Sequence, residues 1–207
     1  MELDFDSVNA TLRDASAGEI IAWALEQGRT VAGAASMGAL RAAELAQFGM
    51  IGVGRIFEAY ATGRFDPFTE PFEDDDEVAV LHGPAETGYA ATEAMVDVRA
   101  TLAAARDADV ITTDDMLSVA GVAKAQFYKR RTWGSVLAAA HGLPDEALGT
   151  LRSWLTENRV QQKRLDAAEL LRQTARRELV ADIPPFRFEQ TLLWETEFPK
   201  ILDRVRE

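Results

Sequence analysis

Apolar side chains recur at helical spacing along most of the chain. The first such segment carries Ile20, Ile21, Ala24 and Leu25, and Gly28 follows it. Glycine readily adopts the left-handed conformation that commonly ends a helix, so we expect this helix to end there. Comparable spacing predicts further helices over residues 36–45, 92–108, 113–128, 132–140, 144–155 and 163–180. We therefore expect a mainly helical chain.

Two short apolar runs predict buried strands. Residues 30–35 read Thr-Val-Ala-Gly-Ala-Ala, and residues 77–82 read Glu-Val-Ala-Val-Leu-His before a Gly-Pro stop. Residues 51–65 hold three glycines and are expected to form a loop and a short helix, whereas the acidic residues 66–76 predict an exposed loop. Strands that alternate with helices are typical of α/β folds, so we predict a small, mostly parallel sheet flanked by helices.

The chain is expected to divide into two parts. Residues 1–143 carry both predicted strands and form an α/β core, and residues 144–207 form a helical C-terminal extension. Pro184 and Pro185 interrupt the helical pattern within this extension. The segment after them, residues 186–194, fits a strand and a helix equally well.

Composition narrows the classes of function. Of 207 residues, 47% are hydrophobic, which suffices for a buried core. The net charge of −12 argues against binding to nucleic acid or to an anionic membrane, because both rely on Lys and Arg. The absence of cysteine excludes a disulfide framework, a cysteine nucleophile and a persulfide carried on this chain. The acidic N-terminus lacks an apolar signal core, and no run approaches the roughly 20 apolar residues of a membrane helix, so we expect a cytoplasmic protein.

Ser36 is the first candidate for chemistry. It stands in Ala-Ala-Ser-Met-Gly, between the strand predicted at residues 30–35 and the helix predicted after it. A serine between small residues at such a turn is typical of a nucleophile elbow. The amides of Met37 and Gly38, at the helix N-terminus, would face the same space and could hold an oxyanion or a carboxylate. The alternative is that Ser36 is only a helix N-cap, a position that favours serine.

His82 is the candidate base for Ser36. It ends the strand predicted at residues 77–82, and the ends of neighbouring parallel strands meet at one edge of a sheet. Along an extended strand, Asp76 would lie about 20 Å from His82, too far to orient it, so a backbone carbonyl or another acid such as Glu86 is expected instead. The alternative is a structural or partner-binding histidine. His141, beside a helix end, is expected to have no chemical role.

Other charged residues leave alternatives open. The acidic run at residues 74–77 could bind magnesium, dock a basic surface or form a solvated loop. Residues 129–131 read Lys-Arg-Arg and are either ordinary surface or a patch for an anion or a partner. Arg41 could point at an anion near Ser36 or pair with Glu44 on the same helix.

Several segments together resemble the TfuA family. Residues 33–45 (Gly-Ala-Ala-Ser-Met-Gly-Ala-Leu-Arg-Ala-Ala-Glu-Leu) are similar to its signature segment, and the similarity continues through residues 49–56, 74–84 and 98–102. Lys124, Tyr128 and Arg131-Thr132 also fit the family's pattern. The resemblance runs in order over roughly residues 18–135, which makes a chance match of short motifs improbable.

The resemblance implies a role in sulfur chemistry. TfuA-like proteins accompany YcaO enzymes, which use ATP to convert a peptide amide into a thioamide in ribosomal peptide modification. The family is thought to recruit a ThiS-like carrier protein, release the sulfur of its C-terminal thiocarboxylate and stimulate YcaO. The expected partners are therefore a YcaO enzyme, this carrier and the precursor peptide, with no cofactor or metal bound to this chain.

Within this reading, each candidate residue has an expected role. Ser36 and His82 would be catalytic. An oxyanion or anion would be bound by Met37, Gly38 and Arg41. Contacts with a partner or substrate are expected from Asp74, Asp75, Asp76, Arg99, Lys124, Tyr128 and Arg131.

Three functions compete. The first is serine-type hydrolysis of the carrier thiocarboxylate, and the second is a non-catalytic adaptor or allosteric activator of YcaO. The third, a general serine peptidase or esterase, rests on residues 34–39, which resemble the nucleophile segment of Clp-type peptidases. Labelling of Ser36 by a fluorophosphonate probe would separate the first and third from the second, and activity on an unrelated ester would favour the third.

Overall fold

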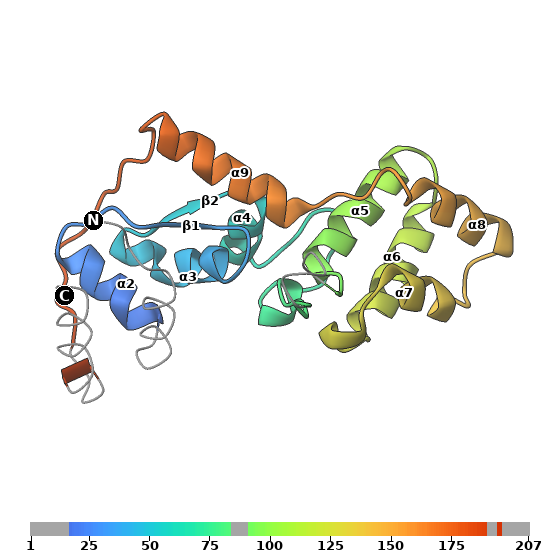
Figure 1. Ribbon diagram of the computed structural model, residues 1–207, viewed down its shortest axis with the longest axis horizontal. Coiled ribbons are helices and arrows are strands. Elements are labelled where there is room, and N and C mark those ends of the chain that lie inside the picture. Colours follow the sequence, from blue (N-terminus) through green and yellow to red (C-terminus); the bar gives the residue numbers. More distant parts are fainter. Residues whose placement is uncertain (1–16, 84–90, 190–193, 196–207) are drawn as a thin grey trace.

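The computed structural model describes residues 17–83, 91–189 and 194–195. Helices and a small parallel sheet confirm the predicted α/β class, with a helical C-terminal part (Figure 1). In chain order the elements are α2 (Ala17–Glu26), β1 (Ala32–Ala34), α3 (Met37–Leu45), η1 (Ala46–Phe48), β2 (Ile51–Val53), α4 (Arg55–Thr62), η2 (Asp75–Glu77), α5 (Met95–Asp107), α6 (Thr113–Lys124), η4 (Tyr128–Arg130), α7 (Trp133–Ala139), α8 (Asp145–Trp154) and α9 (Gln162–Ala175).

The two strands pair in parallel, with Gly33 of β1 opposite Gly52 of β2. The first strand was predicted from its apolar run. The second lies at the start of residues 51–65, which were predicted to form a loop and a short helix: α4 confirms the short helix, and the loop prediction is wrong where β2 forms. Two of the three glycines of this segment are required by packing: a Cβ on Gly52 would lie 1.9 Å from the Phe57 ring, and one on Gly54 would lie 2.4 Å from Asp166 Cγ.

The strand predicted over residues 77–82 is also wrong. Glu77 ends the short 3₁₀ helix η2, and the chain after it does not join the sheet. Its backbone groups are bound from elsewhere. Leu81 N donates to Thr92 Oγ1 at 2.8 Å, and Leu81 O accepts from Ala91 N at 2.7 Å. Of the apolar side chains in this segment, Val78 is buried, Ala79 and Val80 are half-buried and Leu81 is exposed, so the apolar run does not form a buried strand.

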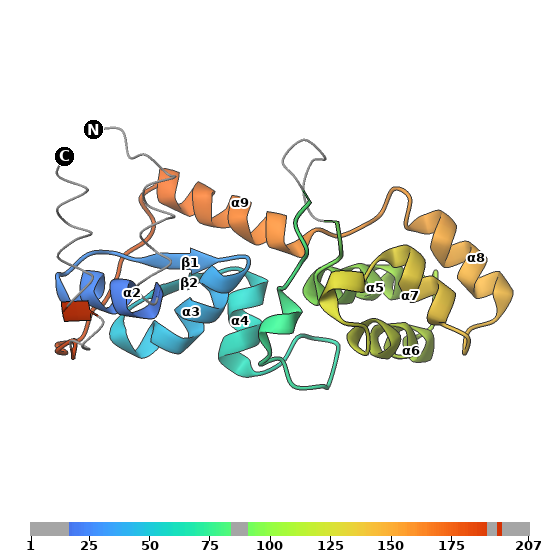
Figure 2. The ribbon, with the colours of Figure 1, turned by 60° about the horizontal axis from the view of Figure 1, so that its bottom comes forward.

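The molecule is elongated, with two lobes (Figures 1 and 2). In one lobe, α9 lies along one face of the sheet and α3 packs on the other, with α2 and α4 beside α3. The other lobe consists of α5, α6, α7 and α8. Residues 63–83 and 91–94, together with the segment before α9, lie between the helices of the two lobes (Figure 1).

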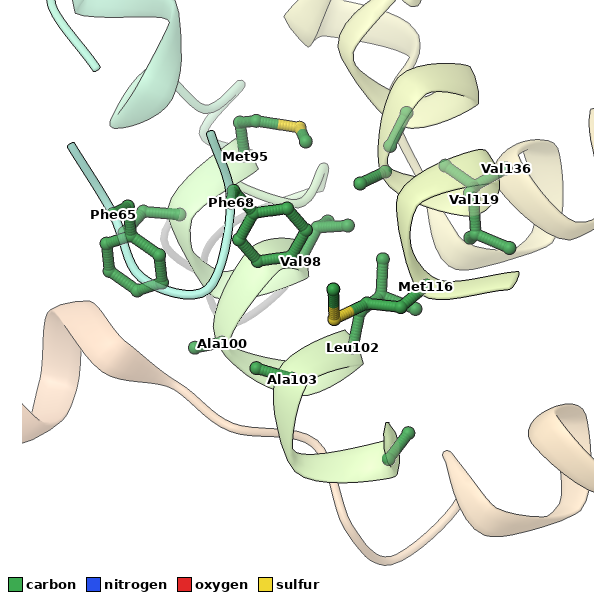
Figure 3. Packing of buried hydrophobic residues seen from close by; sticks show 14 of the residues in the cluster. Phe65, Phe68, Met95, Val98, Ala100, Leu102, Ala103, Met116, Val119 and Val136 are labelled. Carbon is green, nitrogen blue, oxygen red and sulfur yellow. The ribbon is translucent and has the colours of Figure 1, made fainter. Parts of the chain in front are cut away.

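The largest apolar cluster joins the lobes. Figure 3 shows Phe68, from the loop before η2, beside Val98 and Leu102 of α5, with Met116 of α6 next to Leu102. All four side chains are at most 1% exposed. The loop at residues 66–76, predicted to be exposed, therefore contributes aromatic side chains to the core.

Side-chain capping fixes where two helices begin. Thr112 Oγ1 accepts from Asp115 N at the start of α6, and Thr132 Oγ1 accepts from Ser135 N at the start of α7. Both arrangements are capping boxes, and both agree with the predicted helix starts. Helix α5 begins at Met95, three residues after its predicted start at residue 92, and the Thr92 hydroxyl accepts from Leu81 N instead.

Helix α9, from the predicted extension, is joined to the α/β lobe by buried polar contacts. Asp166, 3% exposed, accepts a hydrogen bond from Ile56 N at 2.8 Å and thereby caps α4 from a distance in sequence. Asp97 of α5 accepts from Lys163 N at 3.0 Å and so caps α9. The predicted boundary at residue 143 stays a prediction. In the undecided segment, residues 186–189 form neither strand nor helix, and the Phe186 ring packs on Phe48.

Candidate functional site

Ser36 follows a strained turn between β1 and α3. Ser36 N donates to Ala34 O at 2.8 Å, which closes a γ-turn around Ala35, whose φ is +69°. Positive φ is uncommon for alanine, and this type of γ-turn is rare and strained. Ser36 occupies the N-cap position of α3, but its hydroxyl makes no capping hydrogen bond. The turn thus presents a half-buried serine whose hydroxyl is not used to stabilise the helix.

Close packing of glycines keeps this turn compact. A Cβ on Gly33 would lie 2.0 Å from Gly38 O, so β1 and the first turn of α3 approach each other more closely than any side chain allows. Met37 and Gly38 are the first two residues of α3, where backbone amides have no partner within a helix. The predicted oxyanion-binding amides therefore stand directly after Ser36.

A cavity of about 560 Å³ lies in front of Ser36. Its wall includes His82, so the structure brings the two candidate catalytic residues to one cavity although their predicted strand arrangement is wrong. The His82 side chain is exposed. The described lining residues are Ser36, Met37, Asp75, Asp76, Val78, Ala79, Val80, His82, Phe127, Tyr128 and Lys163.

The acidic run at residues 74–77 is held by cations. Glu77, fully buried, accepts from Arg99 Nε at 3.1 Å and from Lys124 Nζ at 2.9 Å. Asp76 accepts from Arg131 Nη2 at 2.8 Å. Burial lowers the pKa of Lys124, but the hydrogen bond and charge of Glu77, with Asp76, outweigh it and raise that pKa. These contacts fix η2 and with it the acidic wall of the cavity.

Two residues expected to contact a partner belong to the interior. Arg99 is 2% exposed and Arg131 is 0% exposed, and both guanidinium groups are engaged by acids of this chain. A partner protein cannot reach them in this structure, so their expected contact role is corrected to a structural one. Asp74 is exposed and lies 3.3 Å from Lys124 Nζ, while Tyr128 is half-buried on the cavity wall.

Arg41 does not face the cavity. It forms an ion pair with Glu44 one turn along α3, which is the second of its two expected arrangements. Asp76, which an extended strand would have placed far from His82, lines the same cavity because the segment between them is not a strand. Glu86, the other acid considered for orienting His82, lies outside the described residues.

Lys163 is a cavity residue that the sequence did not reveal. It stands in the first turn of α9, and its Nζ donates to Val78 O at 2.7 Å. Burial lowers the pKa of Lys163, and the charge of Asp97 opposes this shift only in part. Nothing in the local sequence distinguishes this lysine from a surface lysine, since its position depends on how α9 packs.

A second cavity, of about 680 Å³, shares its wall with the first through Val80, His82 and Lys163. Asp97 lies on it, and burial raises the pKa of Asp97 to about 6 despite the hydrogen bond from Lys163 N and the charge of Lys163. Glu93 also lines it, and burial raises the pKa of Glu93 although the charge of Arg159 opposes the shift.

The described ranges offer no metal centre: they contain no group of three or more His, Asp or Glu side chains placed to hold an ion. Within the same ranges, every helix is too short or too polar to cross a bilayer.

Comparison with known proteins identifies the family. No curated protein matches the chain. The family model described as TfuA-like protein matches residues 10–132, more than half of the chain, and this span includes Ser36, His82 and the ion pairs behind the cavity. The chain therefore belongs to the family of TfuA-like proteins.

Proposed function

We propose that the protein works with a YcaO enzyme in forming peptide-backbone thioamides and supplies the sulfur by hydrolysing the C-terminal thiocarboxylate of a ThiS-like carrier. The observation that carries this proposal is the shared cavity of Ser36 and His82, with Ser36 presented by a strained strand-to-helix turn. Membership of the TfuA-like family supports the choice of YcaO, and through it the precursor peptide, as partners. The absence of cysteine fits a route in which sulfur is released rather than carried on this chain.

The first half of the reaction breaks the carbon–sulfur bond. Ser36 Oγ attacks the thiocarboxylate carbon while His82 takes the hydroxyl proton. The tetrahedral intermediate then collapses, and sulfur leaves with that proton as hydrosulfide. An ester between the carrier and Ser36 remains. The amides of Met37 and Gly38 hold the oxyanion during this step, as the free amides of a helix N-terminus are suited to do.

The second half releases the carrier. Water attacks the ester carbon, His82 accepts its proton, and the bond to Ser36 Oγ breaks as the hydroxyl regains a proton. The carrier leaves as a carboxylate. In sum, thiocarboxylate and water give carboxylate, hydrosulfide and one proton, so no oxidant or reductant is required. YcaO then uses the hydrosulfide to replace the oxygen of the peptide amide that it has activated with ATP.

A non-catalytic adaptor or activator of YcaO is the second candidate. It is favoured by one observation: among the described contacts, no hydrogen bond joins Ser36 to His82, and His82 is exposed. Catalytic hydrogen bonds often tighten only when substrate binds, so this geometry leaves both candidates open to experiment.

Sulfide release from a thiocarboxylated ThiS-like carrier tests the proposal. We expect Ser36→Ala and His82→Ala each to lower the rate by at least about 100-fold, since each removes a group that acts in the transition state. Matched controls are Ser118→Ala on the exposed face of α6 and His141→Ala after α7, neither of which lines the cavity. Both controls should release sulfide at the native rate.

The outcomes separate the two candidates. Circular dichroism and urea unfolding verify that all four variants fold like the native chain. Equal release by Ser36→Ala and the native chain, or no release by any, would rule out the serine mechanism. Stimulation of YcaO by Ser36→Ala as strong as by the native chain would then identify an adaptor.

A further inference from the structure

Lys163 places a positive charge in the cavity that contains Ser36. Its backbone is fixed at the start of α9 by the hydrogen bond from Lys163 N to Asp97, and its Nζ lies 2.7 Å from Val78 O, itself on the cavity wall. An ammonium group has three donors, so this contact leaves two for a ligand. The side chain is thus both anchored and available.

This charge has no close carboxylate partner within the described residues, where no ion pair within 4.0 Å involves Lys163. Among the described lining residues it is the one Lys or Arg. The cation that the sequence offered, Arg41, pairs with Glu44 instead. Burial lowers the pKa of Lys163, so its charged form is held at an energetic cost that a bound anion would offset.

Asp97, on the adjoining cavity, is the acid whose charge acts on Lys163, but it forms no ion pair with Nζ within 4.0 Å, and the described acids that line the cavity with Lys163 form none either. Asp76 is bound by Arg131 at 2.8 Å and by Lys124 at 3.2 Å, and Asp75 is exposed to solvent. The cavity therefore presents one cation without a close partner beside Ser36 in its described lining, and of its two described lining acids Asp76 is compensated by cations while Asp75 faces solvent.

We propose that Lys163 binds the terminal thiocarboxylate of the carrier and holds its carbon at Ser36. This role rests on the proposed function and names the group that recognises the substrate. A thiocarboxylate is an anion, and attack by Ser36 Oγ places further negative charge on the tetrahedral intermediate. An ammonium beside it attracts the anion and offsets the added charge.

Binding without turnover tests this role. The chain with Ser36→Ala is titrated with the thiocarboxylated carrier and with the same carrier ending in a neutral amide, and Kd is measured by calorimetry. We expect the thiocarboxylated carrier to bind about tenfold more tightly, as a single charge-assisted contact predicts. Adding Lys163→Gln, which keeps an N–H for Val78 O but removes the charge, should reduce the ratio of the two Kd values to about one.

The ratio separates recognition from structural damage. A merely structural Lys163 would weaken both carriers equally and leave the ratio unchanged, which would overturn the proposal. The matched control, Lys129→Gln on η4, removes one positive charge from a side chain that does not line the cavity and should keep the tenfold ratio. Lys163→Arg, which keeps the positive charge, should keep most of the tenfold difference between the two Kd values.

Failure of this role is distinguishable from failure of the proposed function. If neither carrier binds the Ser36→Ala chain, both proposals fall. If both carriers bind, but the ratio of their Kd values is the same with and without Lys163→Gln, only the proposed role of Lys163 is wrong. If the ratio behaves as expected while Ser36→Ala still releases sulfide at the native rate, Lys163 recognises the carrier and the serine mechanism is wrong.

Discussion

Charged side chains behind the cavity stabilise one another in the protein interior. Glu77 and Arg99 are 0% and 2% exposed, and two hydrogen bonds of 3.1 Å join them. The Arg99 guanidinium also lies 5.0 Å above the centre of the Phe68 ring. No buried side-chain nitrogen or oxygen in the described ranges lacks a hydrogen-bond partner. Since removing one member of such a pair leaves the other charge buried, these residues define the fold of the cavity wall rather than its chemistry.

Asp97 gives a pH dependence of stability at the residue scale. Burial raises its folded-state pKa to about 6, above the value near 3.9 of an unfolded chain. The folded state therefore retains a proton that the unfolded state loses, and stability falls as pH rises from about 4 to about 6. Asp97→Asn keeps an acceptor for Lys163 N without the charge. Relative to the native chain, it should gain up to about 3 kcal/mol across this interval and no more above it.

Urea unfolding at intervals between pH 4 and 7 measures this gain. Asp107→Asn, at the exposed end of α5, is the control. A difference between Asp97→Asn and the native chain that is constant with pH would contradict the assignment.

At the scale of elements, two side-chain caps connect α9 to its neighbours: a residue of α5 caps α9, and a residue of α9 caps α4. Asp97 caps α9 from α5, and Asp166 of α9 caps α4 through Ile56 N while also accepting from Gln162 Nε2 at 2.7 Å. Gly54, with φ of +93°, allows the close approach of Asp166. Because the Lys163 amide makes the first contact and Asp166 follows three residues later on the same helix, the position of the Lys163 side chain depends on both.

Removal of the Asp166 carboxylate should loosen this element. We expect Asp166→Ala to destabilise the chain by about 1–3 kcal/mol, the range for leaving a buried partner unsatisfied, and Asp166→Asn to cost less. Amide hydrogen exchange should quicken in α9 and the first turn of α4 before other helices. Unchanged exchange there, with an unchanged urea midpoint, would show that the cap does not hold α9.

For the molecule as a whole, the packing of the α/β lobe depends on residues after 143, which lead back to that lobe from the helical one. Helix α9 covers a face of the sheet that would otherwise face solvent (Figure 2). Ile183 and Phe186 pack against the cluster of Leu25, Ala42 and Met50 on the same lobe. Residues beyond 143 therefore contribute to the packing of the predicted core.

A chain ending at residue 143 tests how far the predicted core depends on this packing. Without α9, a face of the sheet is exposed and Ile56 N loses its cap, so we expect a lower thermal midpoint, a broader transition and no sulfide release. Thermal unfolding followed by circular dichroism measures the first two. A truncated chain that unfolds as sharply as the full chain, at a similar midpoint, would show that the core is independent.

Local patterns in the sequence determined the helices, the first strand and the turn with Ser36. Helical spacing, the capping residues Thr112 and Thr132, and small residues around Ser36 act over a few positions, so they can be read without the fold. The same logic failed where distant packing decides conformation. Gly52 lies in a strand on which Phe57 packs, and Gly54 precedes α4, where Asp166 packs against it.

Only the tertiary structure decided the composition of the cavity. Ser36, His82 and Lys163 are far apart in sequence, and their meeting depends on the path of the chain after η2 and on the packing of α9. Likewise, Arg99 and Arg131 resemble surface cations in the sequence, and burial against Glu77 and Asp76 makes them interior residues. The physical reason is the same in each case. The role of a charged side chain or a glycine depends on the atoms within a few ångströms of it, and those neighbours come from other parts of the chain.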